Sequence, residues 1–100
     1  MAAKVHFGLQ GKSDLKQIGQ YIAGDNPSRA DTFLAEIHAK CLVYAENPEM
    51  GRDRSDLSAK LRSFPHGNYI IFYRRFRRSI QIIRVIRAQR DIRPEMFDQP

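Results

Sequence analysis

Apolar residues recur at helical spacing in the first part of the chain. Leu15, Ile18 and Ile22 lie at positions i, i+3 and i+7, and Tyr21 broadens the stripe that they form. This spacing places them on one face of a short amphipathic helix. Ser13 precedes the stripe and is predicted to be the N-cap, because a serine hydroxyl can accept a hydrogen bond from a free amide of the first turn.

A second and longer apolar stripe predicts a second helix. Asn26-Pro27 should start it, with Asn26 as the N-cap and proline at the first helical position. Asn47-Pro48 should end it, because the residue before a proline is disfavoured in the helical region. The connector at residues 24–26 is so short that the two helices should form an antiparallel hairpin. The stripe comprises Ala30, Phe33, Leu34, Ile37, Cys41, Leu42 and Ala45.

The second half of the chain has the composition of β-strands. Residues 61–64, 69–74 and 80–86 are predicted strands, separated by turn residues. β-branched and aromatic residues dominate the second and third of these runs. The run at 69–73 is apolar at both alternating sets of positions, which predicts a central strand covered on one face by the helices. Residues 49–60 are polar and are predicted to be a loop.

Two further segments complete the predicted architecture. Residues 5–7 are predicted to form a first strand, and the charged tail is predicted to hold a short segment at residues 94–97. The fold class is therefore α+β, with an N-terminal helical hairpin packed on a small, twisted, mainly antiparallel sheet. A length of 100 residues fits one domain, which we expect to span residues 1–100.

Composition and motifs argue against a membrane, secreted, metal-binding or cofactor-binding protein. No apolar run approaches the roughly 20 residues of a membrane span, and the start lacks the apolar region of a signal peptide. We therefore expect a cytoplasmic protein with no membrane association. The single cysteine, Cys41, lies on the apolar face of the second helix and should be buried. Scattered histidines and one thiol provide no metal site, and no cofactor motif is present.

Positive charge is concentrated in the second half. The formal net charge is +6. Residues 1–50 carry five Lys or Arg against six acids, a net charge of −1. Residues 51–100 carry twelve against five, a net charge of +7. This asymmetry favours an acidic or polyanionic partner.

Arginines account for most of that charge and are the candidate binding residues. We expect them to converge at one edge of the sheet, where planar guanidinium groups can bind phosphate or carboxylate at two points. A structural alternative is that some pair with Asp53, Asp56 or Asp91 to hold the loop and the tail. The partner could be a nucleic acid, an acidic peptide or a protein surface, so direct nucleic-acid binding stays open. The candidates are Arg62, Arg74, Arg84, Arg87 and Arg90.

The order of these signals resembles the ParE branch of the ParE/RelE superfamily of toxins from type II toxin–antitoxin pairs. The resemblance covers most of the chain and rests on several short motifs taken together. They are Asp14-Leu15-x-x-Ile18-x-x-Tyr21-Ile22, Asn26-Pro27 with Ala30 and Phe33-Leu34, Glu46-Asn47-Pro48-x-Met50-Gly51-Arg52, Leu61-Arg62-Ser63-Phe64-Pro65-x-Gly67-Asn68-Tyr69-x-Ile71-Phe72-Tyr73-Arg74, and Ile83-Arg84-Val85-Ile86-x-x-x-Arg90-Asp91.

The resemblance implies a toxin that binds and inhibits DNA gyrase, a type II topoisomerase, and that a cognate antitoxin neutralises. Such a toxin is a binding inhibitor with no catalytic residues. The alternative is a RelE-like, ribosome-dependent endoribonuclease that cuts messenger RNA. RNA cleavage needs groups that move protons, and the RelE-like pattern places a tyrosine in the tail where the nearest aromatic residue here is Phe97.

The resemblance also implies contacts with the antitoxin. We expect an amphipathic antitoxin helix on apolar surface of the hairpin and an extended antitoxin strand along the sheet edge, with antitoxin acids meeting the arginines. The candidate apolar contacts are Leu61, Phe64, Ile80 and Ile82.

Overall fold

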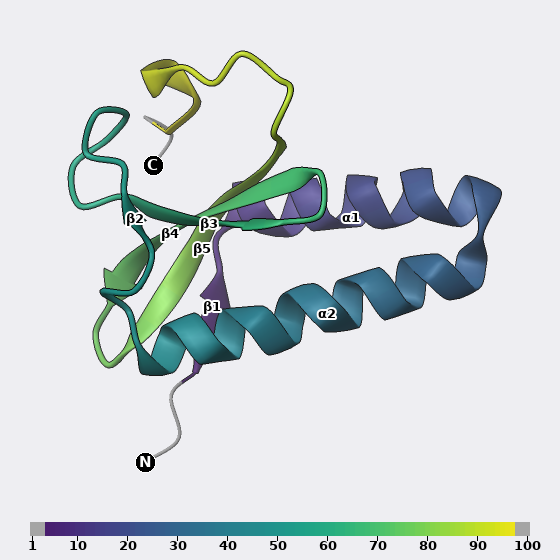
Figure 1. Cartoon of the computed structure of the whole chain (residues 1–100), viewed down its shortest axis with the longest axis horizontal. Helices are drawn as coiled ribbons and strands as arrows, with labels where there is room; N and C mark the ends of the chain where they lie inside the picture. The colour runs from purple at the N-terminus through teal and green to yellow at the C-terminus, as the bar shows by residue number, and fades with distance from the viewer. Residues whose placement is uncertain (1–3, 98–100) are drawn as a thin grey trace.

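A helical hairpin packs against one face of a five-stranded sheet (Figure 1). The computed structural model describes residues 4–97. In chain order the elements are β1 (Val5–Phe7), α1 (Leu9–Asp25), α2 (Pro27–Glu46), β2 (Arg52–Asp53), β3 (Arg62–His66), β4 (Tyr69–Phe76), β5 (Ser79–Arg87) and the 3₁₀ helix η1 (Pro94–Phe97). The predicted α+β fold class and the short segment at 94–97 are confirmed.

The sheet has the order β1-β5-β4-β3-β2, which places β4 at its centre as predicted. The strands β2 to β5 pair antiparallel, whereas β1 pairs with β5 in parallel. Phe72 pairs with Arg84 and Tyr73 with Ile82, so Ile83 is an extra residue in β5 and forms a bulge. The predicted loop at 49–60 is wrong at two residues, because Arg52 and Asp53 pair with β3 as the edge strand β2.

The second helix follows its sequence signals closely. The side chain of Asn26 accepts a hydrogen bond from the backbone N–H of Arg29 at 3.1 Å, and Pro27 is the first helical residue. The helix then runs to Glu46, one residue before Asn47-Pro48. Both predicted boundaries of α2 are confirmed.

The predicted start of the first helix is wrong. Helix α1 begins at Leu9, with Gly8 at the N-cap, so Ser13 lies inside the helix. The backbone N–H of Gly8 donates to Ile82 O of β5 at 2.9 Å, which ties the connection between β1 and α1 to the sheet. A Cβ atom on Gly11 would lie 2.6 Å from the same oxygen. Helix α1 therefore starts early because glycines let its backbone lie directly on β5.

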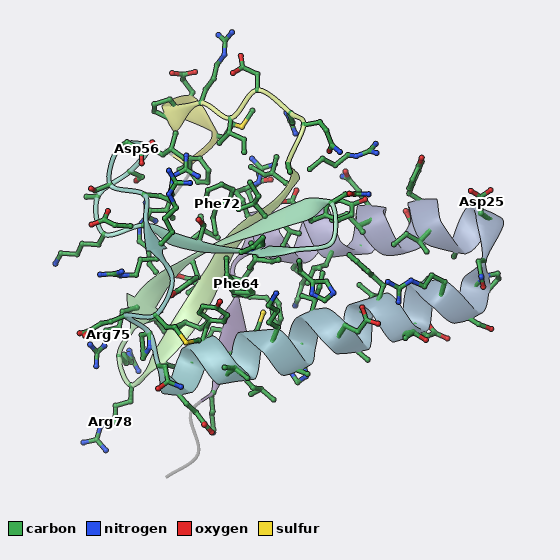
Figure 2. All side chains as sticks on the ribbon, in the orientation of Figure 1. Asp25, Asp56, Phe64, Phe72, Arg75 and Arg78 are labelled. Atoms are coloured by element: carbon green, nitrogen blue, oxygen red, sulfur yellow. The ribbon has the colours of Figure 1, made fainter. Side chains whose placement is uncertain are left out.

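Two apolar cores lie on opposite sides of the sheet. The larger one joins the helices to the sheet and includes Ile37, Phe64 and Ile82. The smaller one lies under the loop before β3 and under η1, and includes Phe72 and Phe97. Figure 2 shows Phe64 on the side of α2 and Phe72 on the side of the tail. The apolar character of β4 at both alternating sets therefore reflects burial on both faces.

The thiol of Cys41 is predicted to be unreactive in the native protein. Cys41 is fully buried in the larger core, and burial raises the pKa of its thiol to about 12. Because the thiolate is the nucleophile, we expect no reaction with iodoacetamide at pH 8 and complete alkylation after unfolding in urea, measured by mass spectrometry. Alkylation of the folded protein at the rate of a free thiol would contradict this burial.

No helix among residues 4–97 is long and apolar enough to cross a membrane.

Candidate functional site

Arg62 is engaged by the backbone of the segment before β2. Its Nη1 donates to the carbonyl of Gly51 at 2.8 Å and to that of Glu49 at 3.2 Å. Nearby, the hydroxyl of Tyr73 donates to Pro48 O at 2.7 Å and accepts from the N–H of Gly51 at 3.0 Å. These contacts hold residues 48–51 against the sheet, so Arg62 has a structural role.

Arg74 binds the loop between β2 and β3. Its Nε donates to the carbonyl of Ala59 at 3.1 Å, and its Nη2 donates to the hydroxyl of Ser58. The loop covers the smaller core through Leu57 and Leu61. Arg74 therefore fixes the cover of that core.

Arg84, on β5, binds both helix α1 and the C-terminal tail. Its Nε and Nη2 donate to the two carboxylate oxygens of Asp14 at 2.7 and 3.2 Å, and its Nη1 donates to Met96 O at 3.3 Å. The same carboxylate accepts the backbone N–H of Val85 at 2.9 Å. Both charged side chains are mostly buried, with 13% and 11% of their surface exposed. This bidentate pair links α1, β5 and the tail.

Arg87 and Arg90, by contrast, are exposed at the end of β5 and just beyond it. Both line a cavity of about 240 Å³ between α1 and the sheet. Tyr21 is 66% exposed, and the guanidinium of Arg87 lies 5.8 Å from the centre of its ring. We call this cavity the arginine groove. Its lining residues are Asp14, Gln17, Ile18, Tyr21, Tyr69, Val85, Ile86, Arg87 and Arg90.

The five predicted arginines do not converge at one edge of the sheet. Arg62 begins β3 and contacts the segment before β2. Arg74 and Arg84 line a second groove beside the tail, where Arg84 also binds Asp14 of α1, and Arg87 and Arg90 line the arginine groove. The β-strand pleat and the separate loops disperse them. Sequence spacing placed the arginines near one another along the chain without specifying the direction in which each side chain points.

The predicted acid partners bind other groups. The carboxylate of Asp56 pairs with Arg54 at 3.2 Å, and that of Asp91 pairs with Arg93 at 2.8 Å. Asp53 accepts the backbone N–H of Ser55. The hydrogen bond from Arg54 lowers the pKa of Asp56, and those from Ser55 lower the pKa of Asp53. Among the described residues, therefore, no carboxylate neutralises Arg87 or Arg90.

The four predicted apolar contacts are core residues. Leu61, Phe64, Ile80 and Ile82 are each at most 1% exposed. Their burial leaves a partner no surface to contact at these positions in the free chain, so this arrangement gives the predicted contacts no support. Large apolar side chains that are exposed lie elsewhere, on Leu9, Tyr21, Leu42, Val43, Met50 and Phe76.

The sequence pattern placed Tyr21 on the apolar face of the first helix, but its side chain is exposed in the arginine groove. It broadens the apolar stripe of α1, yet its ring lies at the margin of the interface with the sheet and is mostly exposed. A tyrosine at the edge of an apolar stripe has a polar hydroxyl and tolerates exposure. The place of Tyr21 at the edge of the apolar stripe was therefore the one sequence signal that it could lie on the surface.

The arginine groove is equipped for binding. It presents two exposed guanidinium groups and an aromatic ring. Its one carboxylate, Asp14, is already held by Arg84 and by the N–H of Val85. Among residues 4–97, no three or more His, Cys, Asp or Glu side chains are placed to hold a metal ion. A planar acidic group or a phosphate lying between the two arginines would fit this chemistry.

Comparisons with known proteins agree with this architecture. A family model described as "ParE toxin of type II toxin-antitoxin system, parDE" matches residues 5–92. A solved structure titled "Chromosomal ParDE TA system from P. aeruginosa" superposes with a TM-score of 0.68 at 18% sequence identity, covering 86% of this chain and 96% of that chain. At this identity the likeness supports the fold. No curated protein sequence matches the chain.

Proposed function

Because the chain belongs to the ParE toxin family of type II toxin–antitoxin systems, we propose that it binds and inhibits DNA gyrase and acts in the cytoplasm. The observation that carries the proposal is the arginine groove, where Arg87 and Arg90 lie beside exposed Tyr21 without a neutralising acid among the described residues. Arginine and tyrosine, together with tryptophan, are enriched among the side chains that dominate the binding energy of protein interfaces.

The groove's one carboxylate and the tail's aromatic residue favour inhibition by binding over RNA cleavage. Cleavage needs a group that accepts a proton and one that donates it. The carboxylate of Asp14 is occupied by an ion pair, and Phe97, the tail aromatic residue, is buried with its ring 4.8 Å from that of Phe72. These observations support a binding inhibitor in preference to the RelE-like ribonuclease.

A cognate antitoxin completes the proposal. Its acidic residues would neutralise Arg87 and Arg90, and its apolar side chains would cover exposed Leu42 and Val43 on α2. The edge strands β1 and β2 have three and two residues, so strand addition there would be short. We therefore expect most antitoxin contact to come from side chains.

Purified protein, freed of antitoxin, should inhibit negative supercoiling of a relaxed plasmid by gyrase. Addition of an equimolar amount of antitoxin should restore supercoiling. Unchanged supercoiling and unchanged levels of the gyrase–DNA cleavage complex would overturn the proposal. Cleavage of messenger RNA in a purified translation system would favour the ribonuclease instead.

Replacement of both Arg87 and Arg90 by glutamine should weaken gyrase inhibition. Loss of two charged contacts of about 0.7 kcal/mol each would raise the half-inhibitory concentration roughly tenfold. Both side chains are exposed, so the melting temperature should stay close to that of the parent protein.

Lys12→Gln with Lys16→Gln is the matched control for this pair. It removes the same charge from exposed positions of α1. Helical geometry places these lysines on the face opposite Asp14 and Ile18, which line the groove. The control should inhibit like the parent protein. Equal loss in both variants would mean that overall charge, and not the groove, determines inhibition.

A further inference from the structure

Two hairpins of this sheet have loops of the same length and different composition. Gly67-Asn68 connects β3 to β4, and Arg77-Arg78 connects β4 to β5. The first residue of each loop has the same left-handed backbone conformation, with φ of 57° at both Gly67 and Arg77. Glycine adopts this conformation without strain, whereas a residue with a Cβ atom does so at a conformational cost.

Arg77 belongs to a cluster of cations at the tip of the β4–β5 hairpin. Arg75, Arg77 and Arg78 line one open groove of about 900 Å³, together with Lys4 from the segment before β1. We call these four residues the tip cluster. Figure 2 shows Arg75 and Arg78 at the end of the hairpin, with Arg78 projecting away from the rest of the molecule.

Acidic side chains compensate this charge only weakly. Glu46 also lines the groove, and Glu49 lies 3.6 Å from Arg75. Both members of the latter pair are largely exposed, with 80% and 64% of their side-chain surface accessible, so water screens their attraction. Arg77 and Arg78 form no ion pair with any residue of the described part of the chain.

An aromatic side chain supports the cluster from within. The guanidinium of Arg77 lies 5.4 Å from the ring centre of Phe76, and the ring of His6 meets the same ring edge-on at 5.3 Å. Phe76, 38% exposed, is the one large apolar side chain among the residues that line this groove, whereas four of them carry a positive charge. An acidic amphipathic helix would need a broader apolar face for docking, whereas phosphates need only the cations.

We propose that the tip cluster binds the phosphate backbone of duplex DNA, with the β4–β5 hairpin directed into a groove of the duplex. The major groove admits a two-stranded β-ribbon, and arginines on such a ribbon reach the phosphates on both sides. A left-handed residue that is not glycine is accepted at functional sites where the side chain is required. The site is separate from the arginine groove and binds free DNA without gyrase.

The experiment replaces the Arg77-Arg78 loop by the Gly-Asn sequence of the other hairpin. Binding to a fluorescent 20-base-pair duplex is measured by anisotropy at several salt concentrations. For the parent protein, four phosphate contacts predict a slope of about −3.6 in a plot of log affinity against log salt concentration. Arg77→Gly with Arg78→Asn should reduce that slope to about −1.8 and lower the affinity at low salt at least tenfold. Its melting temperature should rise, because glycine relieves the strain.

Two further variants make the result decisive. Arg75→Gln with Arg78→Gln leaves Arg77 and its backbone in place and should weaken DNA binding to a similar extent. The control Lys12→Gln with Lys16→Gln should keep the parent slope and affinity. DNA binding by the loop variant equal to that of the parent protein would overturn the proposal, as would equal loss in the control.

Competition separates DNA from an acidic polypeptide as the occupant. Poly-glutamate should displace the duplex less effectively than unlabelled DNA at the same concentration of negative charge. Equal displacement would mean that the cluster responds to negative charge alone, and it would overturn the proposal. Because no gyrase is present, failure here is independent of the supercoiling assay: the arginine groove could still inhibit gyrase in a chain that does not bind DNA.

Discussion

Replacement of Asp14 by alanine is expected to destabilise the protein by about 3 kcal/mol, since removal of one partner leaves a buried charge without compensation. The carboxylate binds the Arg84 guanidinium through both oxygens and also accepts the N–H of Val85. Its loss would therefore leave a mostly buried cation and a backbone donor unpaired. Urea unfolding followed by circular dichroism measures the change.

A double substitution tests whether the ion pair is the cause. Asp14→Leu with Arg84→Met removes both charges and keeps apolar volume, so it should recover a large part of the stability lost in Asp14→Ala. The N–H of Val85 stays unpaired in this variant, which limits the recovery. A loss below about 1 kcal/mol in Asp14→Ala would show that water replaces the carboxylate at little cost.

Local signals predicted the elements better than the contacts between them. Helix α2 was predicted at both ends because Asn26-Pro27 and Asn47-Pro48 act within a few residues of the boundary. The start of α1 depends on Ile82, a residue far along the chain whose carbonyl binds Gly8. No local pattern around Ser13 contains that information.

The candidate site was predicted only in part, for the same reason. Arg84 and Asp14 are 70 residues apart in sequence, and nothing in either neighbourhood identifies the other as its partner. Arg87 and Arg90, two of the five candidate arginines, are exposed and line one groove, but their neighbour Tyr21 comes from α1. Contacts between residues far apart in sequence determine which arginines stabilise the fold and which are free to contact a partner.

The predicted apolar contacts are buried because both faces of the sheet are covered. Ile80 and Ile82 were named as candidate apolar contacts of the antitoxin. The helices cover one face of the sheet, and the loop and η1 cover the other. A strand that is apolar at both sets of alternating positions is better explained by two-sided burial, as β4 already indicated.

Gly11→Ala is expected to destabilise the protein by about 1 to 3 kcal/mol, the usual range for a group inserted where the packing has no room. The new Cβ would lie 2.6 Å from Ile82 O and 3.2 Å from the carbonyl carbon. That oxygen accepts the N–H of Gly8 at 2.9 Å, so it cannot withdraw without loss of the hydrogen bond. Helix α1 must instead move away from β5 and take Tyr21 with it. Chemical unfolding measures the loss of stability, and gyrase inhibition should weaken as the arginine groove widens.

Gly24→Ala in the same helix separates this clash from the intrinsic effect of alanine. Nothing lies within 4 Å of a Cβ atom at Gly24, so only helix propensity should act, and it favours alanine by up to about 1 kcal/mol. The two substitutions are chemically identical and should change stability in opposite directions. If Gly11→Ala also stabilised the protein, α1 would not lie directly on the backbone of β5, and the early start of the helix would need another cause.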